Sequence, residues 1–364
     1  MTLEELEADP HPALARLRAT EPVAWVEVLG AWLVTRRDLA LAAMRDDEGL
    51  TVDDPRFSTA QVVGQSMLTR DGAEHGRHRD PFAHPLRLDA VRERFGAVVV
   101  EEADRLIDGF AERGQAELRR ELAGPLAVAM VAHLLGLERT EEVLAWYDAI
   151  VASVSGVSAG KPVTPEGAAA FAELSASLGT VLDDAPGLSR GELVSNAAVI
   201  MFGGIETTEG MIANAIWHLL TNPVELALVQ ADRSLLPNAV EESLRLEPAA
   251  AVIDRYATRE VELGGVTIPR GDQVTISIAG ANRDPAVFPD PDRYDVRREN
   301  AKLHVAFAQG PHVCIGMHLA RLEAYAAIGR VLDRLPGLGL DPERPSAPAG
   351  LVFRKPPTVH VRWD

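Results

Sequence analysis

One short segment constrains this chain more than any other. Residues 304–316 have the sequence HVAFAQGPHVCIG and contain Cys314, the only cysteine among 364 residues. A single cysteine excludes an internal disulfide, a four-cysteine iron–sulfur cluster, a zinc site built on several cysteines and the C-x-x-C-H attachment of a c-type haem. Two interpretations remain: an inert buried thiol and a single thiolate ligand.

The residues around Cys314 favour the thiolate. Phe307, Gly310, Cys314 and Gly316 form F-x-x-G-x-x-x-C-x-G, and an apolar helical pattern follows. We therefore expect Cys314 just before the N-terminus of a helix, where the helix dipole and free N–H groups favour an anionic sulfur and lower the pKa of the thiol. The glycines let the backbone approach a large, flat group.

A second informative segment lies inside the longest predicted helix. A capping box at Ser189 and Glu192 opens this helix, and Asn222-Pro223 ends it. Residues 203–207 inside it are Gly-Gly-Ile-Glu-Thr, although each interior glycine costs roughly 1 kcal/mol. Either the glycines make room for a ligand, or they allow a close contact with another helix. An acid beside an alcohol can relay protons, which favours the first interpretation.

Both segments resemble those of the cytochrome P450 family, the haem-thiolate monooxygenases, and the order of segments is similar from about Trp32 to the C-terminus. The resemblance implies that Cys314 is the axial ligand of a b-type haem and that Glu206 and Thr207 deliver protons. It also implies haem contacts for Phe307, Gly310, His312 and Gly316. One departure is Ala308, which stands where the family usually has a second glycine.

Three cationic side chains extend the resemblance. His75 and Arg79 lie one helical turn apart, and with Arg255 they match the residues that face haem propionates in the family. A solvated basic turn is the alternative for His75 and Arg79. Pro81 is expected to start or kink their helix, because proline breaks a helix interior.

The fold class implied is mainly α: the cytochrome P450 fold, a helical bundle around haem with small β-sheets near the N-terminus and in the last third, as a single domain over residues 1–364. Glu242 and Arg245 match the family's buried ion pair beneath the cysteine loop, although this spacing is common on any helix. Local patterns predict hairpins over residues 23–35, turning at 29–30, and at 264–265, and helical stretches over 37–45, 88–137 and 141–154.

Composition excludes other classes of partner. The net charge of −18 and the pI near 5.0 argue against nucleic acid, because the phosphate backbone would be repelled. No apolar run reaches the length of a membrane span, and the acidic N-terminal stretch lacks the features of a signal peptide. We expect a cytoplasmic monomer with no membrane partner.

Electrons are expected to come from another protein. No G-x-G-x-x-G fingerprint follows a predicted strand, so NAD(P)H is needed only indirectly, and the resemblance implies a ferredoxin and a ferredoxin reductase. A basic stretch can steer an acidic ferredoxin, although a merely solvated face is the alternative. Its arginines are Arg77, Arg79, Arg87, Arg92 and Arg94.

The substrate prediction starts from the connection between Ser58 and His75. It has only sixteen residues, too few for the helix that usually roofs the pocket in the family, unless neighbouring loops cover the gap. The expected walls are apolar: Val62, Met67, Leu68, Val199, Phe202, Gly203, Ala251, Val252, Ile253, Leu351 and Val352. An open apolar pocket favours a bulky hydrophobic natural-product intermediate, or one tethered to a carrier protein.

The reaction implied by the resemblance is insertion of one oxygen atom of O2 into an organic molecule, with the second atom leaving as water. A peroxygenase or oxidative-coupling enzyme on the same fold is one alternative, and a catalytically silent haem-binding sensor is another. The intact pair of Glu206 and Thr207 favours oxygen activation over both.

Overall fold

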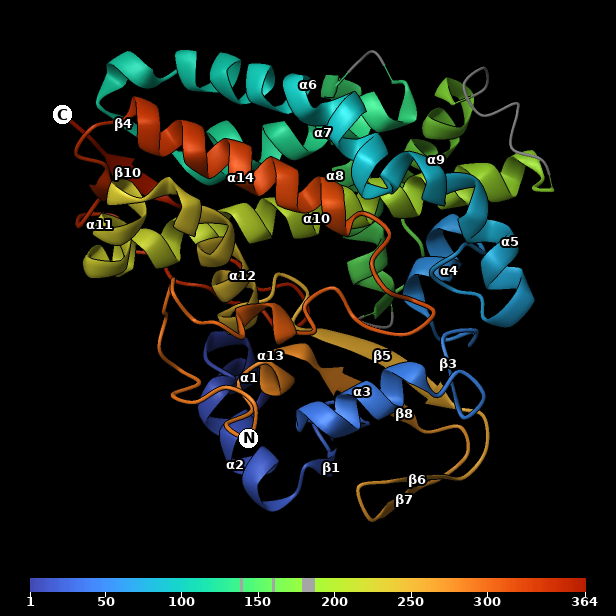
Figure 1. Ribbon diagram of the computed structural model, residues 1–364. Helices are drawn as coiled ribbons and strands as arrows, with labels where there is room; N and C mark the ends of the chain where they lie inside the picture. Colours follow the sequence, from blue (N-terminus) through green and yellow to red (C-terminus); the bar gives the residue numbers. More distant parts are fainter. Residues whose placement is uncertain (138–139, 159–160, 179–186) are drawn as a thin grey trace.

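The computed structural model describes residues 1–137, 140–158, 161–178 and 187–364, and it is mainly α, as predicted. Long helices fill the upper part of the view in Figure 1, and the largest β-sheet lies below them with the N-terminal helices. The loop that carries Cys314 lies between these two parts. The predicted site is therefore central in the molecule.

Four long helices form the framework of the upper part: α6 (Leu88–Asp108), α7 (Gly124–Leu135), α10 (Arg190–Thr221) and α14 (Met317–Arg334). α14 packs against α6 and α10, and α10 also packs against α7. The other α-helices are α1 (Leu3–Ala8), α2 (His11–Thr20), α3 (Arg37–Arg45), α4 (Ser58–Val63), α5 (Gly72–Ala83), α8 (Thr140–Ser158), α9 (Pro165–Ser177), α11 (Pro223–Ala231), α12 (Leu236–Leu246) and α13 (Ile278–Ala281).

Small sheets are predicted near the N-terminus and in the last third, and strands from both regions join in one mixed sheet. Its strand order is β1 (Val23–Val26), β2 (Ala31–Val34), β8 (Gln273–Ser277), β5 (Val252–Ala257) and β3 (Leu50–Thr51). β2 and β8 are parallel, with Trp32 opposite Val274, and the other pairs are antiparallel. A smaller sheet has the order β4 (Gln115–Glu117), β10 (His360–Arg362) and β9 (Gly339–Leu340), and β6 (Val261–Leu263) forms a hairpin with β7 (Val266–Ile268).

The elements with strong local signals are confirmed. β1 and β2 form the predicted N-terminal hairpin, β6 and β7 form the second hairpin, and α3 has the predicted bounds. The capping box is present at the start of α10: Ser189 Oγ accepts from Glu192 N, and Glu192 Oε2 accepts from Ser189 N at 2.7 Å. Each of these signals depends on residues within a few positions of one another.

The predicted helical stretch over 88–137 is interrupted. α6 ends at Asp108, and Gly114 takes a left-handed φ of 67° before strand β4. A π-helical turn at Arg119–Ala123 then leads into α7. β4 forms because β10, more than 200 residues later, pairs with it, and no local pattern contains that partner.

Pro81 does not begin a helix, so the first of its two predicted effects is wrong. α5 starts nine residues earlier, at Gly72, and continues past Pro81 to Ala83. Pro81 lies close to the end of the helix, so the hydrogen bond that it cannot donate is one of the last that α5 could form. His75 and Arg79 therefore lie on one helix.

α10 connects the two largest hydrophobic clusters. Its residues 211–219 pack into a cluster that includes α6, α12 and α14, whereas residues 193–205 pack into a cluster that includes α7, α8 and α9. The segment 203–207 lies where the second cluster ends. It is thus held by the packing on both sides of it.

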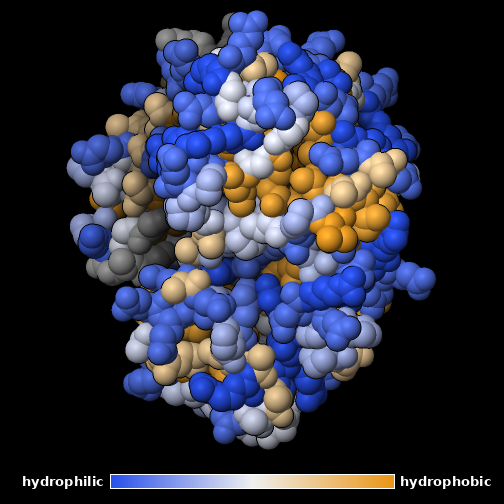
Figure 2. All heavy atoms as spheres, turned by 90° about the vertical axis from the view of Figure 1, so that its left-hand side faces the viewer, coloured by the Kyte–Doolittle hydropathy of each residue, from blue (hydrophilic) through white to orange (hydrophobic). Residues whose placement is uncertain are grey.

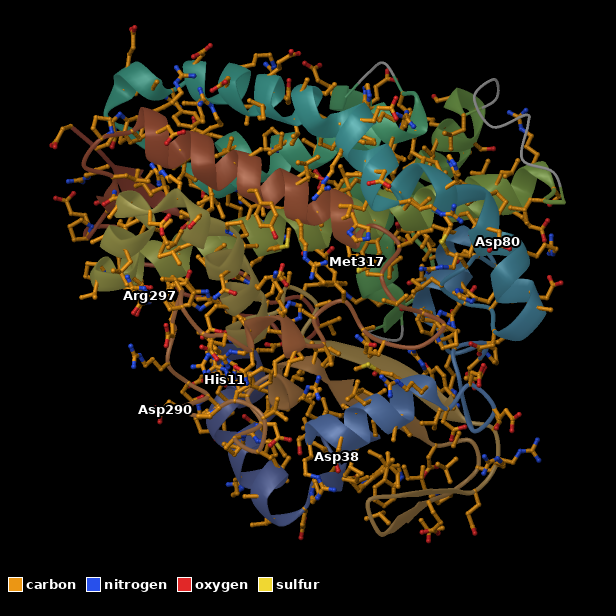
Figure 3. The ribbon with its side chains drawn as sticks, in the orientation of Figure 1. His11, Asp38, Asp80, Asp290, Arg297 and Met317 are labelled. Atoms are coloured by element: carbon orange, nitrogen blue, oxygen red, sulfur yellow. The ribbon has the colours of Figure 1, made fainter. Side chains whose placement is uncertain are left out.

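A buried group of charges ties the start of the chain to its last quarter. Glu247 lies 3.0 Å from His11 Nε2 and accepts from Arg354 Nε at 2.6 Å, and Arg354 Nη1 donates to Glu7 O at 2.9 Å. Figure 3 labels His11 beside the N-terminal helices. Burial raises the pKa of Glu247, but His11, Arg354 and Arg283 outweigh it and lower the pKa to about 2.

Hydrophilic side chains cover most of the face shown in Figure 2, and hydrophobic ones gather in a region of its upper half. Among the described residues, none of the helices combines the length and the apolar composition needed to cross a bilayer.

Candidate active site

Cys314 lies in the loop just before α14, as predicted. Its N–H donates to Phe307 O at 2.8 Å, and Val313 N donates to Gly310 O at 3.1 Å, so two tight turns shape the loop. Figure 3 labels Met317 where α14 begins, in the middle of the molecule. The Cys314 side chain is exposed, although many protein atoms lie around it.

The expected fall in the pKa of the thiol is wrong for this structure. Desolvation raises the pKa of Cys314 and outweighs the opposing N–H groups of Gly316 and Met317 and the charges of Arg79 and Arg321. The predicted helix-terminus effect is present but smaller than the effect of burial. A cationic ligand would be needed to make the anion the stable form.

The glycines of the loop have different roles. Gly310 has a φ of +80°, and a Cβ there would come within 2.6 Å of Met44 O, so this glycine is needed for contact with α3. A Cβ on Gly316 would meet nothing within 4 Å, which leaves that side of the loop open. Ala308 takes a left-handed φ of 58°, a conformation that costs a residue with a Cβ about 1–2 kcal/mol.

His75 and Arg79 both reach the cysteine loop. The His75 ring lies 4.2 Å from the His312 ring, and Arg79 Nη2 donates to Val313 O at 2.7 Å. His75 is only 6 % exposed, and its Nε2 has no hydrogen-bond partner in the described part of the chain. Desolvation, followed by the charges of His312 and Arg79, lowers the pKa of His75 to about 4.

Arg255 is a buried cation with little compensation. It is 6 % exposed, donates to Asp254 O at 2.8 Å and forms no ion pair with any described residue. Asp71 is the acid with the largest effect on its pKa, but Asp71 already accepts from His312 at 2.7 Å. Desolvation lowers the pKa of Arg255, and the two aspartates oppose this shift only in part.

These residues fit the b-type haem of the family. A buried arginine without a carboxylate and a buried histidine with a free Nε2 both lack partners that propionate groups would supply. Cys314 offers the thiolate ligand, and Gly316 leaves room for a flat ring. The contact of Asp71 with His312 was not predicted from the sequence. Asp71 directly precedes α5, a common place for a helix-capping acid, so its position indicated no other role.

The predicted ion pair between Glu242 and Arg245 is present. Both side chains are fully buried, at 2.7 Å, and Glu242 also accepts from Arg298 at 2.8 Å. Arg245 further donates to the carbonyls of Asn282, Pro291 and Arg293. The pair therefore fixes the segment before the cysteine loop.

The neighbouring Glu241 holds the cysteine loop itself, and sequence reasoning missed it. Its carboxylate accepts from Arg321 at 2.6 and 2.9 Å and lies 3.0 Å from His304 Nε2. His304 Nδ1 accepts from Ala306 N, so its Nε2 carries the proton. The Arg321 guanidinium lies 4.4 Å from the centre of the Phe307 ring, which places Phe307 beneath a fixed cation.

The double glycine on α10 serves both purposes considered above. A Cβ on Gly204 would lie 2.7 Å from Val131 Cγ2 of α7, so Gly204 allows a close helix contact. A Cβ on Gly203 would meet nothing within 4 Å, so only Gly203 leaves room. Thr207 Oγ1 donates to Gly203 O at 2.5 Å, and Glu206 is bound by Tyr147 and Lys355.

Five of the expected substrate residues come together in one apolar cluster: Val62, Met67, Leu68, Val199 and Phe202. Ile315, the residue after Cys314, packs against the same cluster. Gly203 lies beside Phe202 on α10. These residues connect the region of α4 to the cysteine loop.

The other expected walls form a separate group. Ala251, Val252 and Leu351 line a small cavity under α1 and α2, and Ala251 is 2 % exposed. Ile253 packs against the core of the large sheet, whereas Val352 is 44 % exposed. Phe353 was not predicted, yet its ring lies 5.4 Å from that of Phe202 and joins this group to the first.

The short connection after Ser58 contains a helix, which corrects the expectation that it has too little length for one. α4 is six residues long, ends at Gly64 with a φ of +82°, and packs against α8 and α9. A glycine in a left-handed conformation stops the helix after less than two turns. The roof over the apolar cluster is therefore short but present.

The predicted basic patch is only partly free. Arg77 pairs with Glu74 and Glu192, and Arg79 turns inward to the cysteine loop. Arg94 is exposed, although its guanidinium donates to His133 O at 2.7 Å. Arg87 and Arg92 are also exposed and form no ion pair within the described ranges.

Comparisons with known proteins agree with this geometry. A family model described as Cytochrome P450 matches residues 172–358. The cytochrome P450 monooxygenase PikC of Streptomyces venezuelae is 35 % identical over 99 % of this chain and 92 % of its own. The 6-deoxyerythronolide B hydroxylase of Saccharopolyspora erythraea is 34 % identical over 100 % of this chain and 99 % of its own.

Solved structures give the same result. P450BioI in complex with an acyl carrier protein ligated to hexadec-9Z-enoic acid has a TM-score of 0.89 and 26 % identity, covering 99 % of this chain and 100 % of that chain. CalO2 also has a TM-score of 0.89, with 28 % identity over 100 % of this chain and 99 % of that chain. This chain therefore belongs to the cytochrome P450 family of haem-thiolate monooxygenases.

Proposed function

We propose that this monooxygenase acts on a bulky, largely apolar natural-product intermediate, free or bound to a carrier protein, with electrons from a ferredoxin. The observation that carries the proposal is the apolar cluster that reaches from α4 to Ile315 beside Cys314. Such walls bind a hydrophobic body but offer few groups to orient a small polar molecule. The whole chain, residues 1–364, serves as one domain in this proposal.

The haem supplies the oxygen-activating chemistry when it is bound. In the proposal, Cys314 ligates its iron, and His75, Arg79 and Arg255 hold its carboxylates. The arginine and histidine donors described above support these roles, because burial without an anionic partner is costly. His312 orients His75 by ring contact, and Asp71 fixes His312.

Glu206 and Thr207 act as the proton relay in this proposal. Glu206 exchanges protons with solvent through its partly exposed carboxylate, which has 13 % of its side-chain surface accessible. The Thr207 hydroxyl next to Gly203 passes a proton into the open side of α10. This division of roles follows from the position of each group. Glu206 lies in the partly exposed ion pair with Lys355, whereas Thr207 lies beside Gly203, where a Cβ would meet nothing.

Two relatives support the choice of substrate class. One relative is a 6-deoxyerythronolide B hydroxylase, and P450BioI was solved in complex with an acyl carrier protein that carries a fatty acid. The short α4 gives the cluster a small roof, which suits a large substrate. Both a free and a carrier-bound intermediate present an apolar body to such a site.

A surface near the thiolate side supports the ferredoxin proposal. Desolvation, followed by the charges of Arg321 and of Arg92 on α6, lowers the pKa of His318 of α14, four residues after Cys314. Arg92 thus places exposed positive charge near the start of α14, and Arg87 and Arg94 are exposed in the same stretch of the sequence. Long-range attraction at this surface is screened over about 8 Å at physiological ionic strength.

Titration of the ferric protein tests the substrate class. Large macrocyclic or carrier-bound compounds are expected to give tight spin-state shifts, whereas small free acids and terpenes are expected to bind weakly. Tight shifts with the small ligands alone would contradict the proposal. For the donor, Arg92→Glu is expected to slow reduction by ferredoxin and to reduce its dependence on salt, and Arg113→Glu, on the exposed turn after α6, serves as a control.

A further inference from the structure

The acid of the proposed relay is held by an unusual residue. Lys355 is one of only three lysines in the chain, and its side chain is 12 % exposed. Its Nζ lies 2.7 Å from Glu206 Oε1 and also contacts Glu209 Oε2. Its stem packs over Gly210, where a Cβ would lie 3.5 Å from Lys355 Cδ. A half-buried lysine in such close packing has a defined position.

Both oxygens of Glu206 are occupied in this arrangement. Oε1 pairs with Lys355, and Oε2 accepts from the hydroxyl of Tyr147 on α8. Thr207 Oγ1 donates instead to Gly203 O. The acid and the alcohol are neighbours in sequence, yet they bind different partners. Glu206 must leave Lys355 and Tyr147 before its carboxyl can donate to Thr207.

Charges from four elements surround this site. α10 contributes Glu206 and Glu209, and Glu209 also pairs with Arg119 of the π-helical turn at 3.1 Å. α8 contributes Tyr147 and Asp148; burial and then Glu206 raise the pKa of each. Arg120 acts on Asp148, and Lys355 comes from the C-terminal segment. Among described residues, Lys355 is the only cation in ion-pair contact with Glu206.

Lys355 belongs to a tight turn that also carries two of the expected substrate residues. The backbones of Ala349 and Lys355 pair at the base of this turn, at 3.2 and 3.3 Å. Leu351 and Val352 lie at its tip, and Phe353 packs against Phe202 of α10. The same short turn therefore contacts the apolar region and the relay acid.

We propose that Lys355 is a positioning residue for proton delivery: it holds the Glu206 carboxylate away from Thr207 until a proton from solvent neutralises that carboxylate. This inference rests on the proposed relay. The proton adds to a Glu206 oxygen and removes the attraction to the ammonium group, so the neutral carboxyl is free to turn. It would then donate the proton to the Thr207 hydroxyl oxygen as that hydroxyl passes its own proton to the oxygen atom of O2 that leaves as water, and the Glu206 anion would return to Lys355.

A stability measurement tests the clamp without turnover. Lys355→Met keeps the chain length and removes the charge, which leaves Glu206 beside Glu209 and Asp148. The Glu206 carboxyl is then harder to ionise in the folded state than in the unfolded one. The loss of folding stability caused by its ionisation is therefore absent at acidic pH and grows as the pH rises. The thermal midpoint of Lys355→Met is expected to fall further below that of the wild type at pH 8 than at pH 5.

The double variant Lys355→Met, Glu206→Gln is expected to lose most of this pH dependence, because Glu206 no longer titrates and only Glu209, which keeps its pair with Arg119, and Asp148 remain there. Lys355→Arg, which keeps the positive charge, is expected to follow the wild type. Lys302→Met removes an exposed lysine and serves as the matched control. If Lys355→Met and Lys302→Met show the same pH profile, the clamp does not exist.

The ratio of turnover in H2O to that in D2O tests the role in delivery. The ratio is expected to fall toward 1 in Lys355→Met, because opening of the clamp no longer limits the transfer, and to stay at the wild-type value in Lys355→Arg. An unchanged ratio in Lys355→Met, with a changed one in Thr207→Ala, would overturn the role of Lys355 and leave the relay intact. Unchanged ratios in both variants would overturn the relay and the inference together.

Discussion

Glu242→Ala is expected to destabilise the protein strongly. The substitution removes a fully buried carboxylate that accepts from Arg245 at 2.7 and 2.8 Å and from Arg298 at 2.8 Å. Breaking a buried ion pair by removing one partner costs about 3–5 kcal/mol, because a charge is left uncompensated. Arg245 keeps its three carbonyl acceptors, and Arg298 keeps others, so we expect a loss of about 4 kcal/mol.

The thermal midpoint converts this loss into a measurable shift. With an unfolding entropy of about 2.1 cal/mol/K per residue and 364 residues, the loss corresponds to a fall of about 5 °C. Far-UV circular dichroism of the haem-loaded protein measures the midpoint. Glu242→Gln keeps an acceptor for the arginines and is expected to give a smaller fall.

The chain contains a matched control for this experiment. Glu102 and Arg105 on α6 have the same residue types and the same spacing, but the Arg105 side chain is 67 % exposed. An exposed pair contributes at most about 1 kcal/mol, so Glu102→Ala should shift the midpoint by about 1 °C or less. A fall of similar size in Glu242→Ala and Glu102→Ala would refute the assigned role of the buried pair.

Three further predictions concern the proton relay, the glycine pair and the loss of stability at acidic pH. Thr207→Ala is expected to keep substrate binding but divert electrons to peroxide, measured as peroxide formed per NADH; unchanged coupling would contradict the relay. Gly203→Ala is expected to stabilise the protein by up to about 1 kcal/mol, whereas Gly204→Ala meets Val131 and is expected to destabilise it by about 1–2 kcal/mol; equal midpoints would contradict the steric argument. The pKa of Glu247 is lowered from 4.5 to about 2, so the stabilisation that its carboxylate provides is present above pH 4.5 and lost as the pH falls toward 2. The difference in thermal midpoint between wild type and Glu247→Gln should therefore shrink over that range. A constant difference would contradict this role of Glu247.

Features that depend on neighbouring residues could be predicted from the sequence. The loop around Cys314, the capping box of α10 and the ion pair of Glu242 with Arg245 each involve residues within about ten positions. Of the three, only the combination of residues around Cys314 is also uncommon enough to point to one kind of chemistry. The structure confirms the placement of all three.

Features that depend on distant partners could not be predicted. Glu241 stands beside Glu242 in the sequence, but its partners His304 and Arg321 are 63 and 80 positions away. Lys355 gave one weak signal, its rarity in an arginine-rich chain, and nothing local links it to Glu206. The roles of such residues follow only from packing, because buried charges take whichever partners the tertiary structure brings near.

The pKa of Cys314 shows where a local argument can have the wrong sign. The helix terminus and nearby arginines favour the thiolate, as the sequence predicts, yet desolvation outweighs them. The amount of burial around a loop depends on elements far away in the sequence, such as α5, whose Arg79 donates to Val313 O, and no local pattern contains them. The same limit applies to Gly310, whose close neighbour is the backbone of α3.

The most direct test of the central assignment is the difference spectrum of the reduced, carbon monoxide-bound protein. If Cys314 ligates the haem iron, the wild type must show the long-wavelength Soret band of a thiolate ligand. Cys314→Ser is expected to lose that band and to bind haem weakly. If Cys314→Ser kept the thiolate spectrum, or if the wild type lacked it, the account of this site would be wrong.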